Sequence, residues 1–165
     1  MKVREIETSD AEKLANLTKR VDESSQYMLW ESGERDIQAK NQLTMIKGMK
    51  DAENSTILVA EKDNDLVGYL IAIGGNARRN RYSAYIVTGI LKAYRGQGIG
   101  TKLFNELEQW AASNNIRRLE LTVVTKNEGG LRLYKKVGFE MEGIKRNSLI
   151  IDGDFVDEYY MSKLL

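Results

Sequence analysis

A glycine-rich junction between a strand and a helix constrains this chain more than any other feature of its sequence. Arg95-Gly96-Gln97-Gly98-Ile99-Gly100-Thr101 follows a strand expected at Tyr82–Leu91. Apolar residues then recur at the spacing of an amphipathic helix, at Leu103, Phe104, Leu107, Trp110 and Ala111. Glycine lets the backbone turn tightly and approach a ligand. The unpaired N–H groups of a helix's first turn favour an anion. The junction is therefore a candidate phosphate or pyrophosphate cradle.

The spacing of these glycines excludes the two best-known phosphate loops. The pattern is G-x-G-x-G, whereas the dinucleotide fingerprint is G-x-G-x-x-G and the Walker loop needs Gly and Lys adjacent. A flexible turn that caps the helix is the alternative interpretation. Taken alone, the junction leaves both interpretations open.

The rest of the chain predicts one mixed α/β domain over residues 1–165. A strand at Met1–Ile6 precedes a helix that begins at the capping-box pattern Ser9-x-x-Glu12 and runs to about Val21. A long polar stretch, Asp22–Asp36, has no clear period, and such loops are often functional. The remaining expected elements are a helix at Ile37–Met49, strands at Thr56–Ala60, Leu66–Ile73 and Leu119–Thr125, a helix at Asn127–Val137, and a hairpin of Phe139–Ile151 and Phe155–Met161 that turns at Asp152-Gly153. This order fits a mixed, mostly antiparallel sheet of about seven strands with about four helices and one parallel crossover, Tyr82–Thr125.

Composition narrows the chemistry that the chain can perform. It has no histidine and no cysteine, so the commonest general base, the commonest metal ligand and the thiolate nucleophile are all missing, and we expect no metal site. The formal net charge is only +1, whereas nucleic-acid-binding domains are usually strongly basic, so a nucleic-acid partner is not expected. No segment approaches the ~18 apolar residues of a membrane span, and we expect a cytoplasmic protein with no membrane partner. Catalysis must use carboxylates, Tyr, Lys, Ser, Thr, backbone amides or a bound cofactor.

A second motif follows the first. Asn127-Glu128-Gly129-Gly130-Leu131-Arg132-Leu133-Tyr134-Lys135-Lys136-Val137-Gly138-Phe139 reads as a short helix that Asn127 caps and Gly138 ends. Leu131 and Leu133 would face the core. For Tyr134, a core position is the simpler interpretation, because tyrosine is commonly part-buried.

Together the two motifs resemble the GNAT acetyltransferase superfamily. The matching residues are Arg-Gly-Gln-Gly-Ile-Gly at the start of a helix, a strand after it, and then Asn127 with Leu-Tyr-Lys-Lys-x-Gly-Phe. The element order matches the GNAT fold along the whole chain. Glu142–Arg146 and Asp152–Glu158 are also similar to a subgroup of small bacterial members. The resemblance implies acetyl-CoA as the cosubstrate, an amine as the acceptor and direct transfer in a ternary complex.

The resemblance also implies roles for particular residues. The loop Arg95, Gly96, Gln97, Gly98, Ile99, Gly100 and Thr101 would hold the pyrophosphate through backbone N–H groups. Ile90 and Leu91 would pair their backbone with the pantetheine arm, and Asn127 would contact the cofactor. Tyr134 would lie beside the thioester sulfur as general acid. A tyrosine of pKa ~10 stays protonated at neutral pH and can hydrogen-bond a departing thiolate.

Two residues depart from the family pattern. Gly130 stands where relatives usually have Ala, and Gly129-Gly130 cost the helix ~1 kcal/mol each. Tyr85 stands where some relatives carry a Glu that activates the amine through water, so that base is not inherited. The carboxylates that remain as candidate bases are Glu31, Glu34, Glu120, Asp157 and Glu158, although acidic side chains are mostly solvated surface charges.

The residues that point to an acceptor lie in the long polar stretch, Asp22–Asp36. Tyr27, Trp30, Glu31 and Glu34 lie together in the long polar stretch, and acidic with aromatic groups suit a cationic amine. The acceptor could be a small amine or a protein N-terminus or lysine. The basic stretch of Arg78, Arg79 and Arg81 could instead touch a phosphate or an acidic substrate, but a solvated turn is the simpler reading. A non-catalytic acyl-CoA-binding module is the rival from another functional class, and a homodimer through the terminal strands is expected by family analogy.

Overall fold

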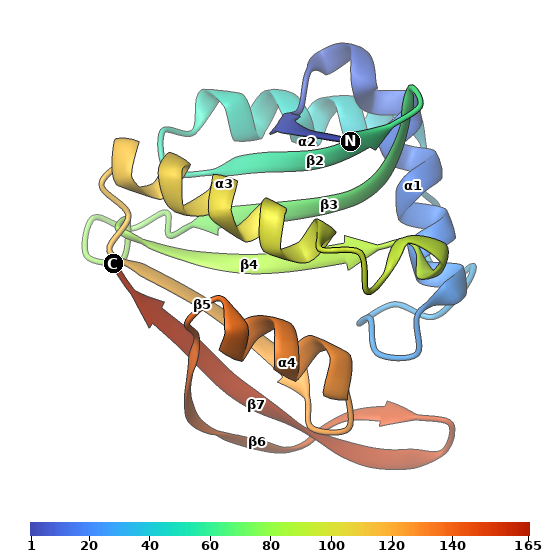
Figure 1. The fold of residues 1–165 in the computed structure, drawn as a ribbon, viewed down its shortest axis with the longest axis vertical. Helices are drawn as coiled ribbons and strands as arrows, with labels where there is room; N and C mark the ends of the chain where they lie inside the picture. The colour runs from blue at the N-terminus through green and yellow to red at the C-terminus, as the bar shows by residue number, and fades with distance from the viewer.

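A computed structural model describes residues 1–165 as a seven-stranded sheet with helices on both faces (Figure 1). The strand order is β1-β2-β3-β4-β5-β7-β6, and β4–β5 is the one parallel pair. The strands are β1 (Lys2–Glu5), β2 (Thr56–Lys62), β3 (Asp65–Gly74), β4 (Ser83–Ile90), β5 (Arg118–Val124), β6 (Glu140–Ile151) and β7 (Asp154–Leu164). The helices are α1 (Ala11–Ser24), α2 (Ala39–Asp51), α3 (Ile99–Ser113) and α4 (Glu128–Lys136). The predicted mixed α/β fold, with its parallel crossover, is confirmed.

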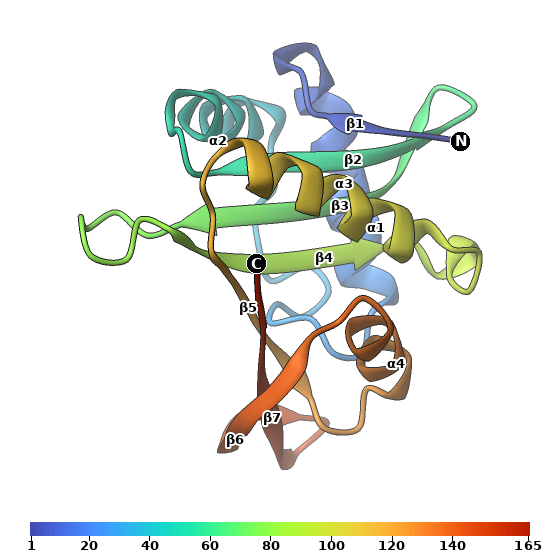
Figure 2. The same cartoon turned by 60° about the vertical axis from the view of Figure 1, so that its left-hand side comes forward.

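The core lies where α1 and α3 cover the sheet from opposite faces (Figure 2). The apolar periodicity of α3 places Ile99, Leu103, Phe104 and Leu107 inward, all almost fully buried. In α1, Leu14, Leu17 and Val21 do the same. Full burial of one such side chain contributes roughly 1.5–3 kcal/mol. The resulting core fixes β1 to β4 and the start of α3 relative to one another.

The sheet divides where β4 and β5 separate. Their parallel pairing is limited to Ser83–Arg118, Ala84–Leu119 and Tyr85–Glu120. Beyond this point β4 stays bonded to β3, whereas β5 follows β7 away from it, and both views show the β5-β7-β6 part turned away from β4. The second half of β4 therefore has one edge that no strand covers. This opening lies between the first turn of α3 and α4.

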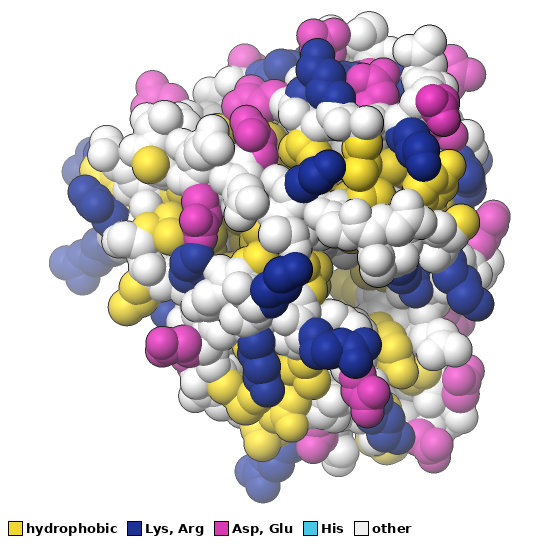
Figure 3. All heavy atoms as spheres, in the orientation of Figure 1, with side chains coloured by type: hydrophobic (Ala, Val, Ile, Leu, Met, Phe, Trp, Pro, Cys, Tyr) yellow, Lys and Arg dark blue, Asp and Glu magenta, His cyan; other side chains and the backbone are white.

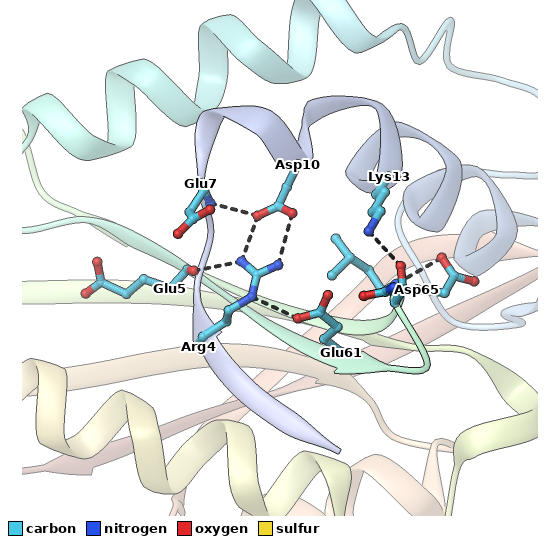
Figure 4. A network of polar contacts seen from close by, with 9 residues as sticks. Arg4, Glu5, Glu7, Asp10, Lys13, Glu61 and Asp65 are labelled. Carbon is cyan, nitrogen blue, oxygen red and sulfur yellow. Dashed lines mark hydrogen bonds and ion pairs between the residues drawn. The ribbon is translucent and has the colours of Figure 1, made fainter.

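The entry to α1 differs from the expected capping box. A short 3-10 turn, Thr8–Asp10, precedes the helix, and the Asp10 carboxylate accepts from the backbone N–H of Glu7 at 2.8 Å (Figure 4). The Arg4 guanidinium donates two hydrogen bonds to that carboxylate and lowers the pKa of Asp10. The predicted Ser9–Glu12 cap is wrong because Arg4, from β1, selects Asp10 instead. The helix also continues three residues past the predicted end, to Ser24.

Two hairpin turns have the left-handed backbone that their residues favour, and the turn predicted at Asp152-Gly153 is one of them. Asp63 and Asn64 between β2 and β3, and Asp152 and Gly153 between β6 and β7, all have positive φ. These pairs suit the two-residue turns whose twist matches antiparallel strands. No helix is long and apolar enough to cross a membrane.

Candidate active site

The glycine loop, Arg95–Thr101, presents a row of unpaired backbone donors. The first α3 hydrogen bond runs from Lys102 N–H to the Gly98 carbonyl, and the N–H groups of residues 96–101 have no acceptor within the protein. Gly96 and Gly98 have φ of +72° and +81°, and a Cβ on either would point into open space. Donors in this arrangement at a helix N-terminus bind an anion. The loop therefore fits a pyrophosphate.

The third glycine of the loop serves a different purpose. A Cβ on Gly100 would lie 2.6 Å from Cδ2 of Leu133, so the glycine lets the Leu133 side chain of α4 lie directly against the first turn of α3. The close contact links the anion-binding turn directly to the helix that carries Tyr134. Gly96 and Gly98 thus leave space in front of the donors, and Gly100 also permits close packing behind them.

The uncovered edge of β4 offers backbone groups beside the glycine loop. Leu91 is not among them, since its N–H donates to the Val67 carbonyl and its own carbonyl accepts from Tyr94 N–H. Backbone groups alternate between the two edges of a strand. Leu91 points toward β3, so Ile90 and Thr88 point toward the opening. Arg95 Nε already donates to the Ile90 carbonyl at 3.2 Å. Of the two residues expected to pair with the pantetheine arm, Ile90 faces the opening, whereas the backbone of Leu91 is bonded to Val67 and Tyr94. Thr88 is the next residue along β4 whose backbone faces the opening.

Helix α4, which carries Tyr134, lies beside the opening (Figures 1 and 2). Asn127 Oδ1 accepts from Gly130 N–H at 3.0 Å, and Gly138, with φ of +96°, ends the helix, so both predicted helix ends are confirmed. A Cβ on Gly130 would lie 2.7 Å from the Asn127 amide nitrogen. The glycine that departs from the family pattern therefore makes room for the cap. Leu131 and Leu133 pack against the core, as expected.

The Tyr134 ring is fixed by two other aromatic rings. Its centroid lies 5.8 Å from that of Phe104 in a T-shaped arrangement and 6.2 Å from that of Phe139. Burial raises the pKa of Tyr134 to about 12, and a contact with the Thr88 hydroxyl opposes that rise. The phenol is therefore a protonated hydrogen-bond donor at neutral pH. Tyr134 thus packs against the core and keeps a hydroxyl that can donate.

The expected acceptor residues lie in the connection between α1 and α2, residues 25–38. Trp30 is 41% exposed, and the Arg35 guanidinium lies 5.4 Å from its ring centroid. Glu31 and Glu34 are exposed and make no ion pair. Tyr27 reaches toward the carbonyl of Lys126 at 3.5 Å, which brings this loop to the start of α4. The loop thus lies on the far side of the opening from the glycine loop.

Three residues that the sequence did not single out, Asp22, Arg35 and Tyr69, interact at the 25–38 loop. Asp22, 4% exposed at the end of α1, accepts three hydrogen bonds from Arg35 at 2.9–3.2 Å. Tyr69 lies flat against Gly89, where a Cβ would sit 2.6 Å from the ring. Burial, and secondarily the Asp22 charge, raise the pKa of Tyr69. No local motif could reveal this group, because its members come from α1, a loop and β3.

The other candidate bases are engaged elsewhere. Glu120 pairs with Arg118 at 2.8 Å. Asp157 accepts from Asn147 N–H and Glu158 from the Ser148 hydroxyl, so both support the bulge in β6. Tyr85 shares a hydrogen bond of 2.9 Å with Thr122. The basic residues Arg78, Arg79 and Arg81 lie in the β3–β4 turn, at the opposite end of β4 from the glycine loop.

The comparisons with known proteins agree with this geometry. Residues 17–139 match the family model described as the Acetyltransferase (GNAT) family. The chain is 31% identical to the L-amino acid N-acetyltransferase AaaT of Escherichia coli over 112 residues, 65% of this chain and 67% of that protein. A solved GNAT-family acetyltransferase from Streptococcus pneumoniae superposes with a TM-score of 0.95 at 28% identity, covering 99% of this chain and 98% of that one. The yncA acetyltransferase structure from Salmonella typhimurium, which holds its cofactor acetyl-CoA, superposes with a TM-score of 0.88 at 18% identity over 99% of this chain and 93% of that one.

Proposed function

The chain belongs to the acetyltransferase (GNAT) family, and from that premise we propose that it transfers the acetyl group of acetyl-CoA directly to a primary amine within a ternary complex. One observation carries the proposal. The unpaired N–H groups of residues 96–101, the uncovered edge of β4 and the Tyr134 phenol border one opening in the sheet. A nucleotide thioester has matching parts in that order: a pyrophosphate, an amide-bearing arm and a sulfur. Residues 1–165 would form one such catalytic domain.

The proposed roles divide along the opening. Acetyl-CoA supplies an acetyl group that is already activated as a thioester. The glycine loop and the first turn of α3 hold the pyrophosphate, with Asn127 beside the cofactor. The backbone of Thr88 and Ile90 orients the arm, in the way that an added strand pairs with a sheet edge. The chain thereby places the thioester carbonyl between Tyr134 and the 25–38 loop.

Tyr134 acts on the leaving group. The amine nitrogen bonds to the carbonyl carbon as the C–S bond breaks, and the negative charge collects on sulfur. A thiol has a pKa of roughly 8.5, well below the value of about 12 for Tyr134, so complete proton transfer from the phenol is uphill. Tyr134 therefore stabilises the sulfur mainly as a hydrogen-bond donor, and the amine's surplus proton leaves through water. That interaction strengthens as charge develops, which is what lowers the barrier.

The acceptor is proposed to enter from the side of residues 25–38. Trp30, Glu31 and Glu34, with Tyr27 beside α4, offer an aromatic surface and negative charge, which suit a cationic amine. The curated relative AaaT is named for L-amino acids, which also present a primary amine. Because Asp22 holds Arg35 beside Trp30, the loop keeps one arrangement in which the amine can meet the acetyl carbon.

A screen of amines tests this function directly. Amino acids, polyamines and a peptide with a free N-terminus and lysine are incubated with the protein and acetyl-CoA, and products are read by mass spectrometry. We expect a mass gain of one acetyl group on at least one amine, intersecting initial-rate lines and no acetylated protein intermediate. Acetyl-CoA binding without transfer to any amine would instead favour a non-catalytic acyl-CoA-binding module.

We also propose a homodimer and a cytoplasmic location. Apolar side chains remain exposed on the β6–β7 hairpin, where Phe155 is 68%, Ile150 60% and Ile144 56% exposed. Figure 3 shows hydrophobic surface toward this lower end of the molecule, while charges of both signs are scattered over the same face. A second copy could cover such a patch. Light scattering at several concentrations and cell fractionation test these two statements.

A further inference from the structure

One buried hydroxyl in this protein has no partner. Among buried side-chain nitrogen and oxygen atoms, only Oγ1 of Thr88 makes no hydrogen bond. An unpaired buried polar group costs about 1–3 kcal/mol, and native structures rarely keep one without a reason. Valine would fill the same space in β4 without that cost. The hydroxyl of Thr88 therefore calls for an explanation beyond packing.

The group on which this hydroxyl acts is the Tyr134 phenol. Thr88 follows the last β4–β5 pair by three residues along β4, at the uncovered edge. The α4 helix carries Tyr134 to this edge, where Phe104 and Phe139 restrict the movement of its ring. The Thr88 hydroxyl acts to lower the Tyr134 pKa, which is the effect of a donor facing the phenol oxygen. The Thr88 hydroxyl therefore acts on the phenol but completes no hydrogen bond in this structure, and active-site hydrogen bonds commonly tighten only when substrate binds.

We propose that Thr88 is a positioning residue that donates a hydrogen bond to the Tyr134 phenol oxygen and so directs the tyrosine's own proton at the thioester sulfur. A phenol oxygen can accept one hydrogen bond while it donates another. With its acceptor side occupied by Thr88, the Tyr134 O–H turns away from β4 toward the opening. As the phenol gives up proton density to sulfur, Thr88 stabilises the charge that grows on the phenol oxygen. This inference rests on the proposed role of Tyr134.

A double-mutant cycle tests the coupling. Thr88→Val keeps the shape and removes the hydroxyl, and Thr88→Ser restores the hydroxyl. We expect Thr88→Val to lower kcat by threefold to tenfold, about the value of one hydrogen bond, with little change in the acetyl-CoA Kd. Thr88→Ser should recover most of that loss. In the Tyr134→Phe background, Thr88→Val should have no further effect, because the group that it positions is gone.

A second measurement needs no turnover. The 13C signal of the Tyr134 ring carbon that bears the hydroxyl, assigned with Tyr134→Phe, should shift in Thr88→Val and return in Thr88→Ser. Thr56→Val, the same change at a buried position in β2, serves as the control and should move neither the signal nor kcat.

The outcomes separate the two levels of the proposal. An equal loss of kcat from Thr88→Val with and without the Tyr134 hydroxyl, or an unmoved 13C signal, would overturn the role of Thr88 alone. Full activity of Tyr134→Phe would overturn the role of Tyr134 as hydrogen-bond donor to the sulfur, on which the role of Thr88 rests. Absence of acetyl transfer in the wild-type protein would count against the proposed function, and the 13C shift would still decide whether the two hydroxyls interact.

Discussion

The glycine loop and the 25–38 loop face each other across the opening in the sheet, and they are built on opposite principles. The glycine loop offers backbone N–H groups, and Gly96 and Gly98 leave open space in front of them. The 25–38 loop offers side chains, which the Asp22–Arg35 ion pair holds in place. A backbone site binds any ligand with the right anion. A side-chain site selects one acceptor among many, and its composition can change without disturbing the fold.

Removal of the Tyr134 hydroxyl should have the largest effect, because Tyr134 serves both sides of the opening. Tyr134→Phe keeps the ring contacts with Phe104 and Phe139. We expect kcat to fall by ~10²–10⁴-fold, or roughly 3–5 kcal/mol of barrier, with little change in the acetyl-CoA Kd. Single-turnover kinetics at saturating substrate check this.

The pH dependence of acetyl transfer follows from the pKa of Tyr134, which burial raises to about 12. The folded phenol keeps its proton at pH values where an unperturbed tyrosine, of pKa ~10, would lose it. The wild-type rate should therefore not decline through this group below about pH 10. A full single-turnover rate in Tyr134→Phe would make Tyr134 a packing residue.

Loss of the Asp22–Arg35 ion pair should weaken acceptor binding and leave acetyl-CoA binding unchanged. Arg35→Gln leaves the buried Asp22 carboxylate without its partner, and we expect a loss of about 2 kcal/mol in the free energy of unfolding. The acceptor KM should rise while the acetyl-CoA Kd stays constant. Arg20→Gln is the matched control, because its partner Asp65 is 50% exposed and such a pair contributes less than about 1 kcal/mol. Equal effects on both ligands would show that the two loops are not independent.

A substitution in the glycine loop should give the opposite result. Gly98→Val places a branched side chain at φ of +81°, in front of the donors. Acetyl-CoA should bind at least tenfold more weakly, roughly 1.4 kcal/mol, as measured by calorimetry. Gly153→Val controls for backbone strain, because Gly153 has φ of +83°, equally open surroundings and a place in the distant β6–β7 turn. Unchanged affinity in a folded Gly98→Val protein would remove the loop from the cofactor site.

The smallest effect is expected from the two exposed carboxylates of the 25–38 loop. The double change Glu31→Gln/Glu34→Gln should raise the acceptor KM by about threefold for a cationic amine, because exposed charges are screened. The effect should shrink further at high salt. Glu12→Gln/Glu140→Gln, also at exposed positions, should leave KM alone. A preferred acceptor that is neutral or anionic, or an unaltered KM, would make this loop merely structural.

The sequence by itself determined the features that depend on near neighbours. The glycine loop, the α3 periodicity, the Asn127 cap, the Gly138 end of α4 and both two-residue turns form as the residues predict. Their geometry is set by φ preferences and by hydrogen bonds within a few residues, so local spacing is enough to specify them. The family resemblance rests on the same local residues, in the glycine loop and in the motif Asn127–Phe139 together.

Only the tertiary structure decided which distant residues meet. Arg4 binds the Asp10 carboxylate in place of the expected cap, and the Leu133 side chain lies where a Cβ of Gly100 would be. The edge of β4 at Thr88 is uncovered because β5 leaves β4 after three paired residues, and the backbone of Leu91 is bonded to Val67 and Tyr94. The Asp22–Arg35 pair likewise depends on where α1 ends. Such contacts are side-chain encounters between separate elements, and no local pattern encodes them because packing of the whole sheet sets their distances.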